Sequence, residues 1–187
     1  KNNKVYRICV LLPDPKFDPY WIRCNDGVND AIQEFRTYKI NIETFYFNPQ
    51  STTSFLEINK TILESEPDAV VLVPLFYNET ITVVNLYNSS GILVTTFNNK
   101  IQSNSIQGFV GQDLIQSGRV AAKLMDSLIK TGTIAIIHID EKYKNAVHMQ
   151  EKEKGFRNYF KEKSSANYEI VTFKLKHPNF ESSLLNF

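Results

Sequence analysis

The sequence contains few cysteines and no hydrophobic run long enough to cross a membrane. Cys9 and Cys24 are the two cysteines among 187 residues, too few for a disulfide framework in a chain of this size. No run approaches the roughly 18 consecutive apolar residues that a membrane-spanning helix needs. The first residues, KNNKVYRICV, form a strand pattern without the features of a secretion signal. We expect two semi-buried thiols and a reducing cytoplasm, with the periplasm as the alternative.

An excess of charge of one sign is also lacking. The formal net charge of +1 predicts neither a nucleic-acid footprint nor a membrane-surface patch within these residues. The hydrophobic and charged fractions, 42% and 22%, are ordinary. The chain is long enough to bury a substantial core, either as one domain or as two small ones.

Motifs of common catalytic sites are missing as well. The sequence has no G-x-S-x-G, G-x-x-x-x-G-K-[ST] or G-x-G-x-x-G, so no nucleophile elbow or phosphate-cradling loop is indicated. His138, His148 and His177 lack metal-ligand spacing with cysteines or carboxylates. The acid pair Asp140–Glu141 lies in a predicted loop, where carboxylates are more often solvated than catalytic. We therefore predict no enzyme, no cofactor and no metal site.

What the sequence does contain is a regular alternation of strand and helix patterns. Short apolar runs bounded by proline or polar residues predict strands, and apolar residues spaced by three and four predict helices. The predicted strands are Val5–Leu12, Ile40–Phe47, Ala69–Val73, Ile92–Phe97, Phe109–Val110, Thr133–Ile139 and Tyr168–Leu175. The predicted helices begin near Trp21, Ser51, Glu79, Asp113, Asn145 and Pro178. The second strand alternates most, which predicts a position near a sheet edge. Such an order implies parallel sheets covered by helices on both faces.

The stretch Gln107–Met125 organises the whole chain, because a short strand in it leads directly into a helix. Before it the pattern describes one α/β lobe of four strands, and from it onward a second lobe of three. We predict two Rossmann-like lobes, an N-terminal one at 1–104 and a C-terminal one at 105–187. The second lobe reaches Leu184–Phe187 without a closing element, so we expect the sequence to be part of a longer chain.

Aromatic, carboxylate and amide side chains follow the predicted strands. In a doubly wound sheet, ligands bind beyond the carboxyl ends of the strands. Aromatic faces cover the C–H side of a sugar while Asp and Asn satisfy its hydroxyls, so a neutral polyhydroxylated ligand fits. The predicted ligand contacts are Asp14, Asp18, Tyr20, Trp21, Phe76, Asn98, Asp113 and Asn145. As alternatives, Tyr20 and Trp21 open a helix and pack on the core, and Asp14 and Asp18 serve only as turn and cap residues.

Several motifs, taken in order, resemble one known superfamily. They are P-x-x-x-F-D-P-Y-W, D-A-V-V-L-V-P, G-I-L-V-T-T-F-N, F-V-G-Q-D-x-x-x-S-G-R-x-A-A-x-L and E-K-G-F-R-N-Y-F. The chain resembles the periplasmic-binding-protein type I superfamily, and within it the effector-binding portion of LacI/GalR-type transcription regulators. The resemblance spans essentially all 187 residues and is most specific from Gln112 to Leu124 and at Gly155–Phe156.

This resemblance implies a two-lobed sensor that closes on a small ligand, usually a sugar, and that is not an enzyme. Asp113 falls on the acidic ligand position of the family, and Tyr20 and Trp21 fall on its aromatic loop. Three residues before Gly155 the family commonly has an arginine, where this sequence has Lys152, which keeps the charge but loses the bidentate fork. Asn98 stands where an aspartate is frequent.

The resemblance also implies partners. LacI-type regulators bind operator DNA through a helix-turn-helix headpiece, which these residues do not contain, and act as homodimers. We expect ligand binding to favour one lobe orientation and so to change operator spacing, with no membrane partner. A periplasmic sugar-binding protein or an extracytoplasmic sensor domain is the competing interpretation, and the full-length N-terminus distinguishes them. An α/β enzyme is a third, which turnover of a sugar phosphate would support.

Overall fold

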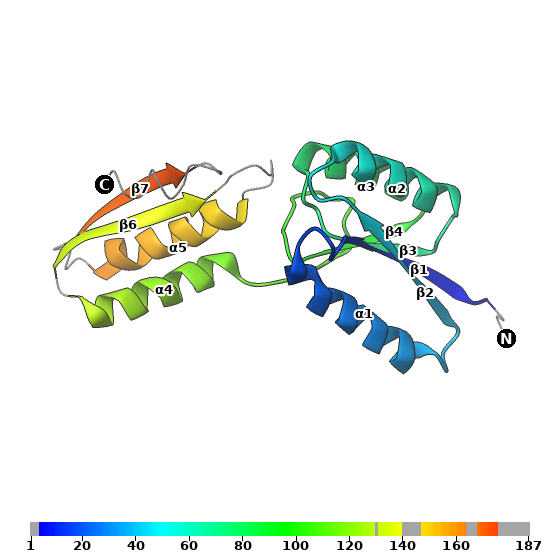
Figure 1. Ribbon diagram of the computed structural model, residues 1–187, viewed down its shortest axis with the longest axis horizontal. Coiled ribbons are helices and arrows are strands. Elements are labelled where there is room, and N and C mark those ends of the chain that lie inside the picture. The colour runs from blue at the N-terminus through cyan, green and yellow to red at the C-terminus, as the bar shows by residue number, and fades with distance from the viewer. Residues whose placement is uncertain (1–3, 130, 140–146, 164–167, 176–187) are drawn as a thin grey trace. The chain divides into compact units, whose positions relative to one another are not determined.

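A computed structural model describes residues 4–129, 131–139, 147–163 and 168–175 (Figure 1). The chain divides into two compact units, Lys1–Gly111 and Gln112–Phe187. Both units carry parallel sheets with helices, which confirms the predicted α/β class. Within the described ranges, no helix has the length and apolar character that a membrane crossing requires.

The first unit is built on a parallel sheet with the strand order β2-β1-β3-β4-β5. The strands are β1 (Tyr6–Pro13), β2 (Ile40–Phe47), β3 (Ala69–Leu72), β4 (Leu93–Phe97) and β5 (Gly108–Val110). α1 (Ile22–Phe35) lies on one face of this sheet, and α2 (Thr52–Glu64) and α3 (Tyr77–Ser89) lie on the other (Figure 1). β2 is an edge strand, as its alternating pattern predicts.

β5 corrects the prediction that Phe109–Val110 opens the second lobe. It pairs in parallel with β4, from Thr95↔Gly108 to Phe97↔Val110. The backbone N–H of Asn98 extends this connection by donating to the carbonyl of Val110 at 3.0 Å. The first sheet therefore has five strands where four were expected, and the described strands of the second unit number two where three were expected. A three-residue strand has no readable period, so its partner is decided by backbone pairing alone.

Three phenylalanine rings form a cluster between the sheet and α2. The ring of Phe55 lies 5.1 Å from that of Phe47 and 5.6 Å from that of Phe76, measured between centroids. Phe55 enters the core in the first turn of α2, which begins where Ser51 Oγ accepts the N–H of Ser54 at 3.1 Å. The edge-to-face geometry adds to the burial of large apolar surface. The cluster therefore joins the end of β2 and the start of α3 to α2.

A buried polar pair joins α2 to α3. The hydroxyl of Tyr87 lies 2.9 Å from Asn59 Oδ1 and 3.1 Å from the Asn59 carbonyl oxygen, and Asn59 Nδ2 donates to the Phe55 carbonyl at 2.7 Å. Tyr87 is 1% exposed and Asn59 is 2% exposed. Burial raises the pKa of Tyr87, so its hydroxyl stays protonated and donates.

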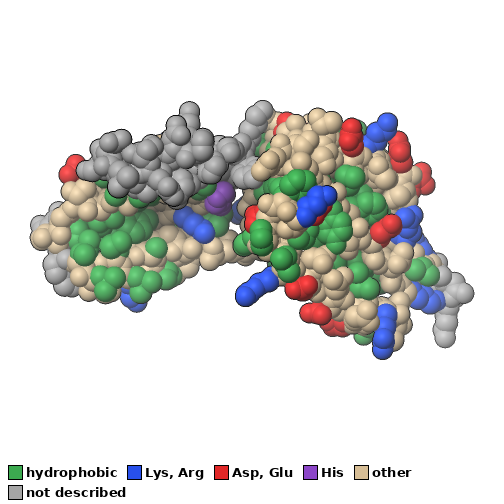
Figure 2. All heavy atoms as spheres, viewed as in Figure 1, with side chains coloured by type: hydrophobic (Ala, Val, Ile, Leu, Met, Phe, Trp, Pro, Cys, Tyr) green, Lys and Arg blue, Asp and Glu red, His purple; other side chains and the backbone are tan. Residues whose placement is uncertain are grey.

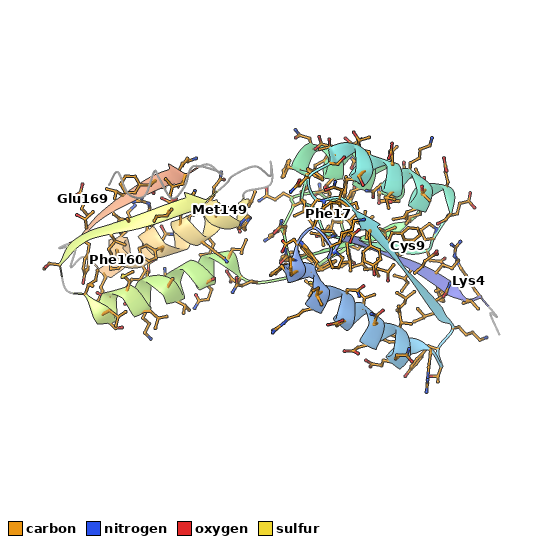
Figure 3. The ribbon with its side chains drawn as sticks, in the orientation of Figure 1. Lys4, Cys9, Phe17, Met149, Phe160 and Glu169 are labelled. Atoms are coloured by element: carbon orange, nitrogen blue, oxygen red, sulfur yellow. The ribbon has the colours of Figure 1, made fainter. Side chains whose placement is uncertain are left out.

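The second unit contains two parallel strands and two helices. β6 (Gly132–Ile139) pairs with β7 (Tyr168–Leu175) along its whole length, and α4 (Leu114–Leu128) and α5 (Val147–Lys163) pack together. Ala122, Ile134, Phe156 and Phe160 form a buried cluster of α4, β6 and α5 residues. Figure 3 labels Phe160, on α5. In outline, β6-α5-β7 repeats the β1-α1-β2 arrangement of the first unit. The helix predicted from Pro178 lies outside the described residues.

Two glycines allow α4 and α5 to approach closely. A Cβ atom on Gly118 would overlap the carbonyl oxygen of Lys152, and one on Gly155 would overlap the carbonyl oxygen of Ile115. Only a residue without a side chain permits this contact between helix backbones. Figure 2 shows hydrophobic side chains gathered on the visible surface of this unit, and those exposed on α4 include Val120, Leu124 and Leu128.

Candidate ligand-binding site

The loop after β1 presents an aromatic pair at the carboxyl end of the first sheet. A short 3₁₀ helix, Pro19–Trp21, begins where the side chain of Asp18 accepts the N–H of Tyr20 at 2.9 Å. The rings of Tyr20 and Trp21 meet edge to face with centroids 5.0 Å apart. Tyr20 is 59% exposed, whereas Trp21 is 4% exposed. Trp21 therefore anchors the loop in the core, and Tyr20 offers its ring to solvent.

Tyr20 also connects this loop to the end of β4. Its hydroxyl donates to Asn98 Oδ1 at 3.0 Å. β3 lies between β1 and β4 in the sheet, so this hydrogen bond passes over the end of β3. Asn98 has a positive φ of 65°, a left-handed conformation that asparagine adopts more readily than most residues. The structure therefore brings together three of the predicted site residues, Asp18, Tyr20 and Asn98.

Asp14 forms an ion pair with Lys16 in the same loop. Its Oδ1 accepts the backbone N–H of Lys16 at 3.0 Å, and its Oδ2 lies 2.8 Å from Lys16 Nζ. Burial is the largest single influence and raises the pKa of Asp14, but the hydrogen bonds and charge of Lys16 together lower it below its usual value. The Lys16 ammonium also lies 5.0 Å from the centroid of Phe17, at the same end of the sheet (Figure 3). The Asp14 carboxylate is thus ionised but already engaged by a cation.

Phe76 and Trp21 offer little surface to a ligand. Phe76 is 7% exposed and packs against Phe47 and Phe55. Trp21 is similarly buried, as the alternative interpretation of its helical position expected. Both residues pack in the core beneath the loop, and of the three predicted aromatic contacts only Tyr20 has an exposed ring.

The remaining predicted residues belong to the second unit. Asp113 is exposed and caps α4, where its Oδ1 accepts the N–H of Gln116 at 2.9 Å. Lys152 is exposed on α5 and borders a pocket of about 250 Å³ between α4, α5 and β6. Met149, near the start of α5, lines the same mainly apolar pocket (Figure 3). Asn145 lies outside the described residues, as does the acid pair that precedes it.

A partly buried polar network in the second unit was not predicted. Glu153 Oε1 accepts from Arg157 Nε at 2.7 Å and from Thr172 Oγ1 at 2.5 Å, and its Oε2 lies 2.9 Å from His138 Nε2. Arg157 donates further to the Ile170 carbonyl at 3.0 Å and to Thr172 at 2.7 Å. Burial is the largest influence on Glu153 and raises its pKa, but Thr172, Arg157 and His138 together lower it overall.

Part of this network has a sequence signal. Glu153 and Arg157 are four residues apart on one helix, a spacing that places opposite charges side by side. Their partners on β6 and β7 follow only from the folded sheet. Within the described ranges, no group of three or more His, Cys, Asp or Glu side chains is placed to hold a metal ion.

Comparison with known proteins identifies the family. The family described as "Periplasmic binding protein domain" matches residues 8–182. The chain belongs to this family. Among solved structures, the periplasmic binding protein domain is similar to a candidate LacI transcriptional regulator from Bacteroides fragilis, with a TM-score of 0.83 and 24% identity. That alignment covers 98% of this chain and 64% of the other.

Solute-binding proteins share the same fold. An ABC transporter solute binding protein from Burkholderia multivorans has a TM-score of 0.73 at 17% identity, and the alignment covers 94% of this chain and 61% of the other chain. A glucose-galactose binding protein from Geobacillus stearothermophilus has a TM-score of 0.70 at 19% identity, covering 93% and 59%. The domain therefore spans about three fifths of the length of these structures. No curated protein sequence matches the chain. At these identities the likeness shows the fold alone.

Proposed function

We propose that this domain binds a small polyhydroxylated molecule, a sugar, and transmits its occupancy without chemical change. The observation that carries this proposal is the exposed Tyr20 ring held beside the Asn98 amide at the carboxyl end of the first sheet. A flat aromatic face suits the C–H side of a sugar ring, and amide and carboxylate groups suit its hydroxyls. Structural relatives include a glucose-galactose binding protein and a solute binding protein with bound D-fucose.

A neutral ligand fits the charges of this surface. In the loop after β1, Asp14 is paired with Lys16, so these two charges largely compensate each other. Asp18 uses one carboxylate oxygen to cap the 3₁₀ helix. No uncompensated cation that would favour a phosphate is evident among these loop residues. The aromatic ring and the amide are then the main recognition groups.

We further propose that the domain is the effector-binding part of a cytoplasmic LacI-type transcription regulator. Such a protein acts as a homodimer on operator DNA through a headpiece outside this sequence, and ligand binding changes its affinity for that DNA. The similarity to the LacI-type protein, with its TM-score of 0.83, supports this assignment. A periplasmic sugar-binding protein or extracytoplasmic sensor domain is the second candidate, supported by the similarity to solute-binding proteins.

A thermal-shift screen of mono- and disaccharides against the intact protein tests the binding proposal, because a ligand selective for the folded state raises the melting temperature. We expect at least one sugar to raise it, Tyr20→Ala to remove the response, and Tyr38→Ala to keep it. Tyr38 is a matched control because it is 63% exposed and lies between α1 and β2, at the amino end of β2 and not at the carboxyl ends where the candidate site lies. A flat response to every sugar would contradict sugar binding. Operator binding by the full-length protein separates the two candidates.

A further inference from the structure

The hydrogen bond between Tyr20 and Asn98 resembles a ligand contact made by the protein itself. The Tyr20 hydroxyl donates to Asn98 Oδ1 at 3.0 Å, from a loop 78 residues away in the sequence. A phenolic O–H and a sugar O–H are the same kind of donor, and each also has acceptor lone pairs. The amide oxygen that a sugar hydroxyl would use is therefore already occupied by an exposed side chain.

Asn98 is the fixed partner in this contact. Its backbone N–H donates to the Val110 carbonyl at 3.0 Å, and its left-handed φ of 65° sets the direction of the side chain. Its Nδ2 lies 3.5 Å from Asn99 Oδ1, which further orients the amide. The acceptor position is thus determined by the ends of β4 and β5. The Asn98 acceptor is therefore exposed only when the Tyr20 side chain moves.

Tyr20 is the partner that can move. Its side chain is 59% exposed and touches Trp21 only edge to face, while its backbone is held by Asp18. Rotation of the side chain therefore breaks one exposed hydrogen bond and leaves the 3₁₀ helix capped. Trp21 stays anchored beneath it with 4% exposure.

Resting on the proposed function, we propose that the Tyr20 hydroxyl occupies the position at Asn98 Oδ1 that a sugar hydroxyl would take. A sugar has to displace it, after which the Tyr20 ring is available for stacking. Tyr20 then lowers the affinity of the site for a sugar, because each binding event breaks one hydrogen bond within the protein. Removing the hydroxyl while keeping the ring removes this competition.

The test compares the intact wild-type protein with Tyr20→Phe, Asn98→Ala and Tyr38→Phe. Each is titrated with D-glucose, D-galactose and D-fucose, and binding is followed by the fluorescence of Trp21, the one tryptophan of the sequence. An exposed neutral hydrogen bond corresponds to a change of about three- to tenfold in the dissociation constant. We expect Tyr20→Phe to bind a sugar tighter by about that factor, Asn98→Ala to bind it more weakly, and Tyr38→Phe to match wild type.

Each outcome has a defined meaning. Binding to Tyr20→Phe that is unchanged or weaker than wild type overturns the proposed competition and leaves sugar binding intact. Binding seen with Tyr20→Phe and not with wild type supports it. Binding by none of the proteins contradicts the proposed function, and this inference with it. Melting temperatures without sugar check that each variant is folded, which the exposure of Tyr20 leads us to expect.

Discussion

The Nε2 atom of His138 on β6 lies 2.9 Å from the Oε2 atom of Glu153 on α5. Both side chains are largely buried, with exposed fractions of 6% and 18%. The second carboxylate oxygen of Glu153 accepts from Arg157 and from Thr172 on β7. One carboxylate therefore ties a helix to both described strands of the second unit.

The pH dependence of stability follows from the lowered pKa of Glu153. A carboxyl whose pKa is lower in the folded state stabilises the fold above its ordinary pKa, and this contribution is lost as the pH falls through the lowered value. We expect Glu153→Gln to reduce the free energy of unfolding by about 1–3 kcal/mol at pH 7. This difference from wild type should shrink below about pH 4. Urea denaturation at pH 7 and at acid pH measures it.

Glu64→Gln is the matched control for this series. Glu64 pairs with Lys60 at 3.8 Å on the surface of α2, with an exposed fraction of 65%. Surface pairs of this kind contribute little, so its effect should be near zero at both pH values. If Glu153→Gln behaved like Glu64→Gln, the network would have no role in stability.

Alanine substitutions at Gly118 and Gly155 test the close contact of α4 with α5. Each added Cβ meets a backbone carbonyl of the facing helix, and neither backbone can move without separating the helices. We expect each to lower the free energy of unfolding by about 2–3 kcal/mol. Gly27→Ala in α1 is the control, because nothing lies within 4 Å of the new Cβ, and it should raise stability by about 0.5–1 kcal/mol. Equal effects at all three positions would count against the steric explanation.

Tyr87→Phe tests the polar pair between α2 and α3. The substitution leaves the buried Asn59 side-chain oxygen without its donor, so we expect a loss of about 1–2 kcal/mol in the free energy of unfolding. Tyr38→Phe, at a residue 63% exposed, should change stability by less than about 0.5 kcal/mol. Chemical denaturation of both variants provides the comparison. If Tyr87→Phe left the free energy of unfolding unchanged, the hydrogen bond between Tyr87 and Asn59 would not contribute to stability.

Two substitutions at Asp113 separate a helix cap from a ligand contact. Asp113→Ser keeps an oxygen that can accept the N–H of Gln116, whereas Asp113→Ala removes the cap and should cost about 1 kcal/mol. If the carboxylate contacts the ligand, both variants lose the thermal shift produced by an active sugar, and Asp113→Ala alone has a lower melting temperature without sugar. A full thermal shift in Asp113→Ser would restrict Asp113 to its capping role.

Local signals predicted much of the fold. Apolar runs predicted β1 and β3 as strands, the alternation of β2 predicted an edge strand, and α2 begins near Ser51 as predicted. These features depend on neighbours within a few residues. β5 was assigned to the wrong sheet because three residues carry no period, and its membership depends on hydrogen bonds to β4.

The sequence predicted which residues belong to the candidate site, but not which of them contact one another. The rule that ligands gather at strand ends selected Asp18, Tyr20 and Asn98 from sequence alone, and the structure places these three together. It could not show that Tyr20 donates to Asn98 across 78 residues. Burial of Phe76 likewise depends on rings from two other elements.

The hydrogen bonds between α5 and β7 help to specify the register of β7 against β6. Arg157 and Glu153 both reach Thr172, which sits opposite Ile136 in the strand pair. Sliding the strand by one position would point Thr172 away from the helix, and sliding it by two would offer Ile170 or Lys174 in its place. Neither of these has a hydroxyl. A chain paired in the wrong register would therefore leave Glu153 and Arg157 without their shared hydroxyl partner, even if all backbone hydrogen bonds between the strands were formed.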